Sequence, residues 1–426
     1  MSNYVYFKTK TDYLYNVDSK NDIFSDDLLD LIKDTELKEL IINKYDLDKN
    51  ILINIDKADI VYNQIKSYVD RFELLRLTVP ENKVDTFLKE NPEEKKYDYY
   101  FNIKEACIDE NTGEMIENLE AVAIYDSLDL FYKARSLSQY VKSLNKSKNL
   151  NKSQLLDDLN ISWKRHFDKY PKDVKPKIFR VLKNKDLYYV KSINSKQYKE
   201  YGIAESFVLS MLELNKIHLR EEVNFTISSI SLRESKIDMI ISLDKKVSIK
   251  DVGYFRPSIS IRNEDTGNAS LGVHTSIEFY PENNEDNNKI YLFPKKDKDN
   301  NKIENKTTAN HTINQDTLLE LFESISDLFD YLKQVEKDFK FYNDAQHPDE
   351  LRQKIAEKVC NTKGMFKGLT QLQGLFERKK DQQITNLQNL LEMCGKAEML
   401  DMDFDLKFKL RYLISNVLLY GNNTIK

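Results

Sequence analysis

Cysteine, glycine and proline are scarce in this chain. Among 426 residues there are three cysteines, Cys107, Cys360 and Cys394, with 10 glycines and 8 prolines. Three widely spaced cysteines can form neither a disulfide framework nor a zinc knuckle. Such cysteine use is typical of a reducing environment, so we expect a cytoplasmic protein.

Long apolar runs are missing too. The first residues, Met-Ser-Asn-Tyr-Val-Tyr-Phe-Lys, lack both the basic segment and the apolar segment of a signal peptide. No run approaches the roughly 18 apolar residues that a membrane-spanning helix needs. The sequence therefore predicts a soluble, intracellular protein without a membrane partner.

The common catalytic and cofactor motifs are also absent. The chain has no Gly-x-x-x-x-Gly-Lys-Ser/Thr, Gly-x-Gly-x-x-Gly or Gly-x-Ser-x-Gly, so neither nucleotide hydrolysis nor serine hydrolysis is supported. His218 and Glu221 lie one helical turn apart but lack the second histidine of a zinc-protease helix. Asp401, Asp403 and Asp405 are more typical of a helix N-cap than of a Mg²⁺ site. We assign no catalytic residue, no metal ligand and no cofactor.

Hydrophobic and charged residues are both plentiful. The chain is 40% hydrophobic, 11% aromatic and 32% charged, with 25 tyrosines and 21 phenylalanines. This apolar content is enough to offset chain entropy, so the chain is expected to fold. At about 100–200 residues per domain, the length predicts two or three domains.

Positive charge is concentrated in one block of the sequence. Residues 131–200 contain 18 Lys and Arg against 6 Asp and Glu, a net charge of +12, whereas the whole chain has a net charge of -5. The first 130 residues have a net charge of -13 and the last 226 a net charge of -4. We call residues 131–200 the basic block.

Aromatic residues are interspersed with the cations of the basic block. Lysine and arginine displace counterions from phosphates, and aromatic rings stack on bases, so this combination predicts a nucleic-acid-binding segment. With no recognition motif nearby, we expect weak binding without sequence preference. Two alternatives stay open: a solvated surface, or docking on an acidic part of this chain or of another protein subunit. The predicted nucleic-acid-binding residues are Trp163, Lys164, Arg165, Lys169, Tyr170, Lys172, Lys175, Lys177 and Arg180.

Residue periodicity predicts an α+β fold, in which a central antiparallel sheet is flanked by a small α+β N-terminal domain and a helical C-terminal region. We expect an acidic α+β domain over residues 1–125 and a basic helical segment plus antiparallel sheet over residues 126–280. Residues 281–315 are rich in Asn, Asp and Lys and predict a loop or linker. Residues 316–426 predict a helical bundle.

Four alternating runs carry the prediction of the central sheet. They span residues 223–227, 237–243, 259–261 and 271–279. Such alternation is typical of an antiparallel sheet with one buried face. The other face should carry polar side chains, which are Ser258, Ser260, Arg262, Ser270, His274, Ser276 and Glu278. Upstream we expect helices over residues 126–144, 154–167 and 198–214 and a hairpin over residues 179–193.

The segment Val252-Gly-Tyr-Phe-Arg-Pro-Ser-Ile-Ser-Ile-Arg-Asn-Glu-Asp-Thr-Gly resembles the core of the phage/plasmid-like protein family, a domain of unknown function on mobile elements. The resemblance covers about residues 200–280 and implies a phage or plasmid origin, with the host-cell cytoplasm as the location of a phage-encoded protein. The matching residues are Val252, Gly253, Arg256, Pro257, Ile259, Ile261, Asn263, Glu264 and Gly267.

The same segment has two interpretations. Asn263 and Gly267 tolerate positive φ, so the simpler one is a hairpin turn between two strands. The functional interpretation is a polar cluster at one end of the sheet, without a nucleophile beside a base. The members of this possible cluster are Arg256, Arg262, Glu264, Asp265 and His274.

Taken together, these patterns predict a non-enzymatic accessory protein of a phage or plasmid that binds nucleic acid through the basic block. One alternative is a structural or assembly subunit of a phage particle or multi-protein complex. A third possibility is an enzyme with an unrecognised site.

Overall fold

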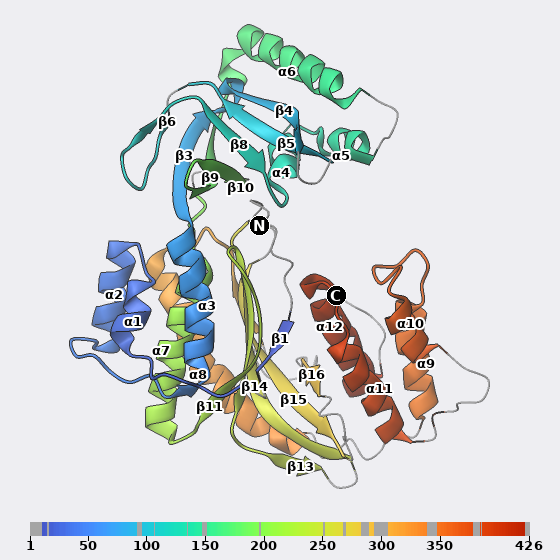
Figure 1. Cartoon of the computed structure of the whole chain (residues 1–426). Helices are drawn as coiled ribbons and strands as arrows, with labels where there is room; N and C mark the ends of the chain where they lie inside the picture. The colour runs from blue at the N-terminus through green and yellow to red at the C-terminus, as the bar shows by residue number, and fades with distance from the viewer. Residues whose placement is uncertain are drawn as a thin grey trace. The chain divides into compact units, whose positions relative to one another are not determined.

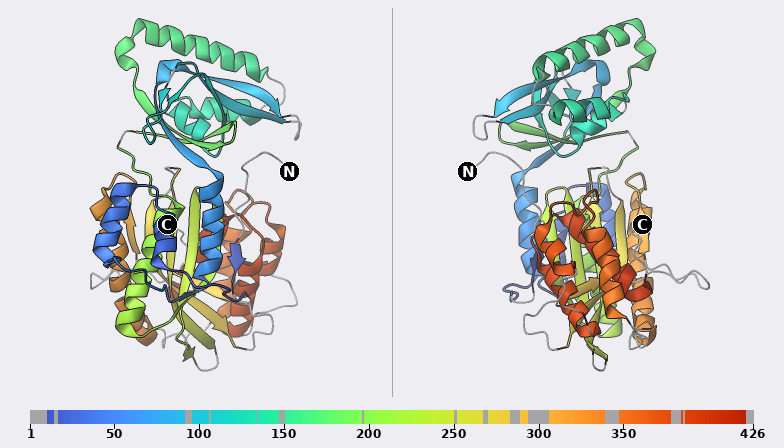
Figure 2. Two further views of the ribbon diagram at one scale, coloured as in Figure 1. Left: turned by 60° about the vertical axis from the view of Figure 1, so that its left-hand side comes forward. Right: turned by 90° about the vertical axis from the view of Figure 1, so that its right-hand side faces the viewer.

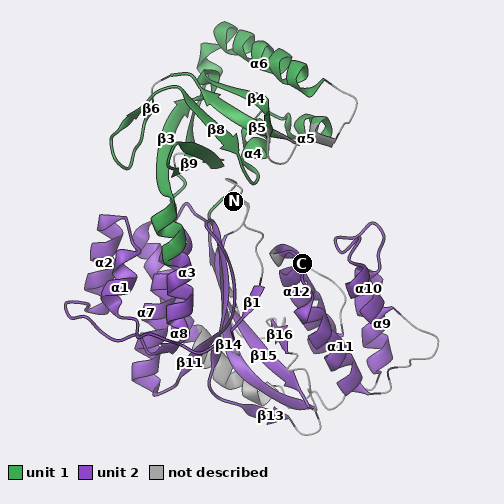
Figure 3. Ribbon diagram, viewed as in Figure 1, with its two compact units in different colours: residues 1–5, 66–200, 264–269 green, residues 6–65, 201–263, 270–426 purple. Residues whose placement is uncertain are grey.

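The computed structural model divides the chain into two compact units (Figure 3). Unit 1 comprises residues 1–5, 66–200 and 264–269, and unit 2 comprises residues 6–65, 201–263 and 270–426. The structure describes residues 11–14, 17–91, 96–105, 107–133, 135–146, 151–195, 197–249, 252–266, 270–282, 289–293, 306–338, 347–377, 384 and 386–421.

The sequence suggested domain boundaries at residues 125, 280 and 315. The two units have different boundaries. Residues 73–80 pair with residues 176–183, so the stretch after residue 66 belongs with the basic block. Residues 11–13 and 55–56 instead pair with residues of the central sheet. Each unit is therefore assembled from segments that are distant in the sequence and joined by strand pairing. The composition had suggested domains that follow one another along the chain.

Unit 1 contains a six-stranded sheet in the order β3-β9-β10-β8-β5-β4 (Figure 1). Its neighbouring strands are antiparallel except β8 and β10, which are parallel. The predicted hairpin of residues 179–193 is confirmed as β9 and β10. The strands are β3 (Glu73–Pro80), β4 (Val84–Asn91), β5 (Lys96–Ile103), β8 (Leu119–Ala123), β9 (Pro176–Asn184) and β10 (Leu187–Asn194). β6 (Cys107–Ile108) and β7 (Met115–Ile116) form a separate two-stranded ribbon.

Helices cover one face of this sheet. Leu75, Leu77 and Phe179 point toward this face and pack with Phe131 and Val141 of the helices. The single helix expected over residues 126–144 is two helices, because Ser136 has a φ of 58° and interrupts the helical hydrogen bonds. The helical elements of unit 1 are α4 (Ser127–Lys133), α5 (Ser138–Lys146), α6 (Lys152–Lys169) and the 3₁₀ helices η1 (Glu81–Lys83) and η2 (Pro171–Asp173).

Unit 2 is built on a nine-stranded, curled sheet with the main order β1-β11-β12-β14-β15-β16. The four alternating runs of the sequence are its strands β11, β12, β14 and β15, which confirms the antiparallel central sheet and the α+β class. The strands are β1 (Thr11–Tyr13), β2 (Ile55–Asp56), β11 (Phe225–Arg233), β12 (Lys236–Leu243), β13 (Val247–Ile249), β14 (Gly253–Glu264), β15 (Leu271–Pro281), β16 (Ile290–Leu292) and β17 (Lys306–Ala309).

Helices lie on both sides of this sheet (Figures 1 and 2). α7 and α8 lie on one side, and α9, α11 and α12 pack on the other. The helices of unit 2 are α1 (Ser25–Asp30), α2 (Thr35–Tyr45), α7 (Ile203–Glu221), α8 (Gln315–Asp338), α9 (Pro348–Val359), α10 (Thr370–Phe376), α11 (Leu387–Met399) and α12 (Phe404–Tyr420), while α3 (Ala58–Arg71) continues into unit 1.

Both faces of the central strands are buried, which corrects the expectation of a solvated polar face. Ser258, Ser260, His274, Ser276 and Glu278 are all buried. α12 covers His274, whose Nδ1 is hydrogen-bonded to Tyr412 Oη (3.1 Å). Glu278 is instead paired with the buried Lys289 (2.5 Å) next to β16. Buried serines remain possible because they find partners, such as the 2.8 Å bond between Ser258 and Ser276.

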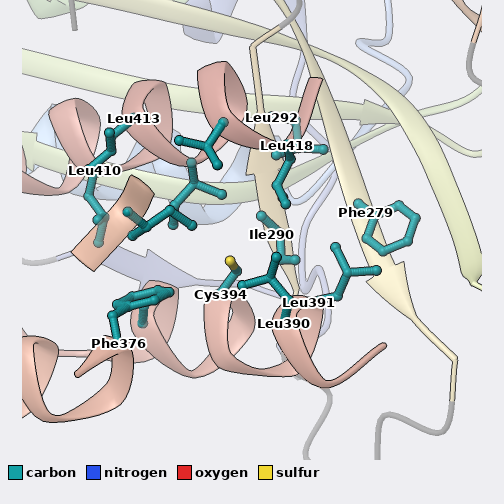
Figure 4. Close-up of a cluster of buried hydrophobic side chains, with 14 of the residues drawn as sticks. Phe279, Ile290, Leu292, Phe376, Leu390, Leu391, Cys394, Leu410, Leu413 and Leu418 are labelled. Carbon is teal, nitrogen blue, oxygen red and sulfur yellow. The ribbon is translucent and has the colours of Figure 1, made fainter. Parts of the chain in front are cut away.

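The predicted C-terminal helices are confirmed, and they share a core with the sheet (Figure 4). Phe279 of β15 and Ile290 of β16 pack with Leu391, Cys394 and Leu413. The stretch expected to be a loop or linker, residues 281–315, contributes β16 and β17, and residues 283–288 and 294–305 lie outside the described residues. In the described chain, no helix has the length and apolar character needed to cross a membrane.

Candidate nucleic-acid interface

α6 is a well-defined amphipathic helix at the edge of unit 1. Its N-cap is Asn151, whose side-chain oxygen accepts a hydrogen bond from the Gln154 N–H (3.3 Å). Leu156 and Phe167 are its buried residues. The Asn160 side chain donates to the Thr86 carbonyl (2.7 Å) and accepts from the Thr86 N–H (3.2 Å). α6 thus covers part of the open edge of β4, the last strand of the sheet, by bonding the backbone of Thr86.

The chain turns in an ordered way after α6. The N–H of Tyr170 donates to the His166 carbonyl (2.8 Å), and the N–H of Asp173 donates to the Tyr170 carbonyl (3.0 Å). The His166 ring also contacts the Asp173 carboxylate (3.0 Å). The end of α6 and η2 therefore present their side chains from a defined backbone.

Five predicted cations share this end of α6 and the turn that follows. All five are exposed, and within the described residues no carboxylate lies within 4.0 Å of them. Tyr170, between the two elements, is 47% exposed. We call the five cations the basic patch: Lys164, Arg165, Lys169, Lys172 and Lys175.

Trp163 occupies a different environment from the one expected. It is half-buried and packs against Phe167, with ring centroids 5.5 Å apart. The Arg135 guanidinium lies 5.0 Å from its ring and 4.0 Å from the Phe131 ring. Burial lowers the pKa of Arg135, and the nearby Glu81 opposes this shift. Trp163 is thus part of the packing between α6 and α4, which leaves Tyr170 as the exposed ring of the patch.

Lys177 and Arg180 do not belong to the basic patch, which corrects their assignment to phosphate contacts. Lys177 pairs with Glu81 (3.5 Å). Arg180 is 0% exposed, forms an ion pair with Glu200 and donates to the Tyr198 carbonyl (3.2 Å). Both lie on β9: strand pairing on both sides buries Arg180, whereas Lys177 stays partly exposed and is neutralised by Glu81.

Further cations of the basic block are also neutralised within unit 1. Lys183 pairs with Glu73 (2.8 Å), and the buried Lys191 pairs with Asp265 (2.9 Å) and Glu200 (2.5 Å). Burial raises the pKa of Asp265 to about 6, although Lys191 opposes the shift. The intramolecular alternative considered from the sequence therefore holds for part of the block. Of its exposed cations without a carboxylate within 4.0 Å among the described residues, five lie together on the basic patch and Lys133, Lys185 and Lys199 lie elsewhere in unit 1.

The polar cluster proposed around the 263–267 turn does not form one site. Arg256 lies 3.8 Å from Asp244, Arg262 pairs with Asp405 (2.6 Å) and His274 bonds to Tyr412. In unit 1, Asp265 pairs with Lys191, and Glu264 accepts a hydrogen bond from Thr266 (3.0 Å). Arg262 and His274 lie near each other, since both contact the Phe408 ring. Arg256 lies further along the β14–β15 ladder, and Glu264 and Asp265 lie beyond its last pair, Arg262 and Gly272. Residues 267–269 of the predicted turn lie outside the described residues.

Sequence reasoning missed a buried ionic centre in unit 2. Arg411 of α12 donates to Glu398 of α11 (2.6 Å) and lies 3.8 Å from Asp238 of β12. Tyr13 donates to Glu398 (2.8 Å), and Lys407 donates to the Tyr13 hydroxyl (3.0 Å). Burial lowers the pKa of Lys407 to about 8 and raises that of Asp238. The local signal for this centre is Asp238, a carboxylate in a largely apolar run. The alternation of apolar and polar residues does not show what such a carboxylate pairs with.

We interpret this ionic centre as structural. It connects β1, β12, α11 and α12, and the Arg411 cation lies between two carboxylates, those of Glu398 and Asp238. Among the described residues, no group of three or more His, Cys, Asp and Glu is placed to hold a metal ion. Comparison of the chain with protein-family models, with curated proteins and with solved structures gives no match. The resemblance to the phage/plasmid-like family therefore stays a prediction.

Proposed function

We propose that this protein binds nucleic acid through the basic patch of unit 1, as a non-enzymatic accessory protein of a phage or plasmid. The observation that carries the proposal is the set of five exposed cations, without carboxylate partners among the described residues, on the ordered end of α6, on η2 and just after η2. Each such cation can neutralise a phosphate and release a counterion. Tyr170 supplies one exposed ring for stacking.

The same geometry favours modest affinity without base readout. Consecutive exposed cations on one side of a helix meet the sugar-phosphate backbone, which carries no sequence information. Asp168 and Asp173 lie within the same segment and reduce the local positive potential. The acidic remainder of the chain opposes a long polymer in the same way.

The test is a fluorescence-anisotropy titration of the full chain with labelled single- and double-stranded DNA at several salt concentrations. If four of the five cations contact phosphates, the log-log salt slope should be about -3 for single strands and about -3.6 for duplex. The variant Lys164→Glu/Arg165→Glu/Lys169→Glu should lose most of this binding.

A matched control separates the patch from net charge. Lys133, Lys185 and Lys199 are also exposed, belong to unit 1 and have no carboxylate within 4.0 Å among the described residues. The variant Lys133→Glu/Lys185→Glu/Lys199→Glu changes the charge by the same amount and should bind much as the parent does. Equal losses in both variants would mean that net charge alone controls binding. No salt-sensitive binding by the parent would reject the proposal in favour of a patch that docks on an acidic protein subunit.

A further inference from the structure

The β6–β7 ribbon of unit 1 holds two apolar side chains in solvent. Ile108 and Met115 face each other across the ribbon and are 56% and 62% exposed. Directly opposed residues on one face of a two-stranded ribbon form a single contact surface. Glu114 and Glu117 are exposed beside them, and no cation lies within 4.0 Å of either carboxylate in the described chain. We call residues 107–117 the ribbon.

The ribbon is fixed in place by its turn. The buried Asp109 carboxylate accepts hydrogen bonds from the Arg76 N–H (2.7 Å) and from the N–H (3.1 Å) and hydroxyl (2.7 Å) of Thr112. The Glu110 N–H donates to the Arg76 carbonyl (2.8 Å), which attaches the turn to β3. The apolar pair is therefore presented by an ordered element, and a partner that covers it bears little ordering cost.

A surface of matching chemistry exists on the same unit. The basic patch carries five exposed cations, and the exposed side chains of Ile161 (49%) and Tyr170 (47%) flank it. The basic patch thus combines cations with apolar side chains, whereas the ribbon combines carboxylates with apolar side chains. Both surfaces are exposed in the structure, so the ribbon does not cover the patch of its own chain.

We propose that the ribbon of one copy docks on the basic patch of a second copy. The apolar pair covers Ile161 and Tyr170, and Glu114 and Glu117 approach the cations that would otherwise contact phosphates. So small an interface, with charges at its rim, associates weakly and is salt-sensitive. Nucleic acid competes for the same cations, although the docking itself does not depend on the proposed function.

Sedimentation velocity of the full chain without nucleic acid tests the contact. At about 50 mM salt the parent should sediment faster as its concentration rises, and at about 500 mM salt this dependence should disappear. The ribbon variant Ile108→Ser/Met115→Ser and the patch variant Lys164→Glu/Arg165→Glu/Lys169→Glu should each associate at least about tenfold more weakly. A parent that stays monomeric at every concentration, or either variant associating as the parent does, would overturn the proposal.

Mixing the two variants identifies which surfaces meet. The ribbon variant keeps an intact patch and the patch variant keeps an intact ribbon, so their mixture should form a one-to-one complex that neither forms alone. The absence of that complex contradicts the contact. As a control, Leu219→Ser/Met365→Ser removes two exposed apolar side chains from unit 2 and should leave association unchanged. If this control variant also lost association, the contact would be a non-specific apolar one and the proposal would be wrong. The ribbon variant should still bind DNA as the parent does, which separates this proposal from the proposed function.

Discussion

At the scale of single residues, burial decides what each charged or aromatic side chain can do. Trp163 and Tyr170 are both rings of the basic block, yet one packs against Phe167 and the other is 47% exposed. Arg165 is exposed while Arg180, also in the basic block, is completely buried. Residue type alone therefore does not identify a binding residue, because exposure depends on the neighbouring elements.

Tyr170 and Trp163 should respond differently to substitution. We expect Tyr170→Ala to weaken single-stranded DNA binding by about 1–3 kcal/mol through loss of base stacking. Trp163→Phe keeps a ring in the contact between α6 and α4 and should leave binding unchanged. Anisotropy titration of both variants against the parent decides this. If Trp163→Phe lost the binding and Tyr170→Ala kept it, the assignment of the stacking ring would be reversed.

Lys407 should make stability depend on pH. Its pKa is lowered to about 8 in the folded chain by burial, whereas an unfolded lysine has a pKa of about 10.4. Between these values the unfolded chain binds more protons, so this residue makes the free energy of unfolding rise with pH, and its contribution is lost as pH falls through about 8.

The comparison of Lys407→Met with the parent isolates this effect, since other titrating groups cancel in the difference. From about pH 7.5 to about pH 9.5 the parent should gain about 1–2 kcal/mol in unfolding free energy relative to the variant. Urea denaturation at each pH gives the measurement. A difference that does not change over this range would show that Lys407 titrates as an exposed lysine does.

At the scale of secondary structure, α6 shows how one polar side chain joins a helix to a sheet. Asn160 makes two hydrogen bonds to the backbone of Thr86 on the edge strand β4. The sequence predicted this helix well, since the expected range 154–167 lies inside Lys152–Lys169. The role of Asn160 was not predictable, because its partner lies 74 residues away in the chain.

Asn160→Ala should destabilise the protein by about 1–3 kcal/mol, since the Thr86 N–H and carbonyl lose their partner. Asn151→Ala removes the N-cap of the same helix and should cost about 1 kcal/mol, within the range known for exposed caps. Chemical denaturation compares the two variants. A smaller loss for Asn160→Ala than for Asn151→Ala would mean that water replaces the contact with β4.

At the scale of the whole molecule, long-range pairing determines which segments belong together. Lys191 on β10 forms ion pairs with Glu200 and with Asp265, which is 74 residues further along the chain. Asp265 belongs to unit 1 although the residues on either side of the segment 264–269 belong to unit 2. The buried ion pairs thus hold a distant segment of the chain to the sheet of unit 1.

Lys191→Met should cost about 3–5 kcal/mol, because the buried Asp265 carboxylate loses its cation, whereas the partly buried Glu200 keeps Arg180. Lys185 lies at the exposed turn between β9 and β10. Lys185→Met should change stability by less than about 0.5 kcal/mol. Urea unfolding monitored by circular dichroism measures both. A cost for Lys191→Met close to that of Lys185→Met would show that water enters the cluster and screens its charges.

The sequence by itself determined the class of the fold and most of its elements. The runs at 237–243 and 271–279 alternate with period two, and this local pattern is enough to predict β12 and β15. The positive charge around Lys164 was equally visible, since a surplus of lysine and arginine needs no partner to be recognised.

Only the tertiary structure decided which of these residues face solvent and where the units divide. Arg180 lost its predicted role because strand pairing buries it beside Glu200. The predicted boundary at residue 125 was replaced because β3 pairs with β9, about a hundred residues away. Periodicity reports the environment of neighbouring residues in the chain, whereas burial, ion pairing and unit boundaries depend on contacts between distant residues, which local patterns do not encode.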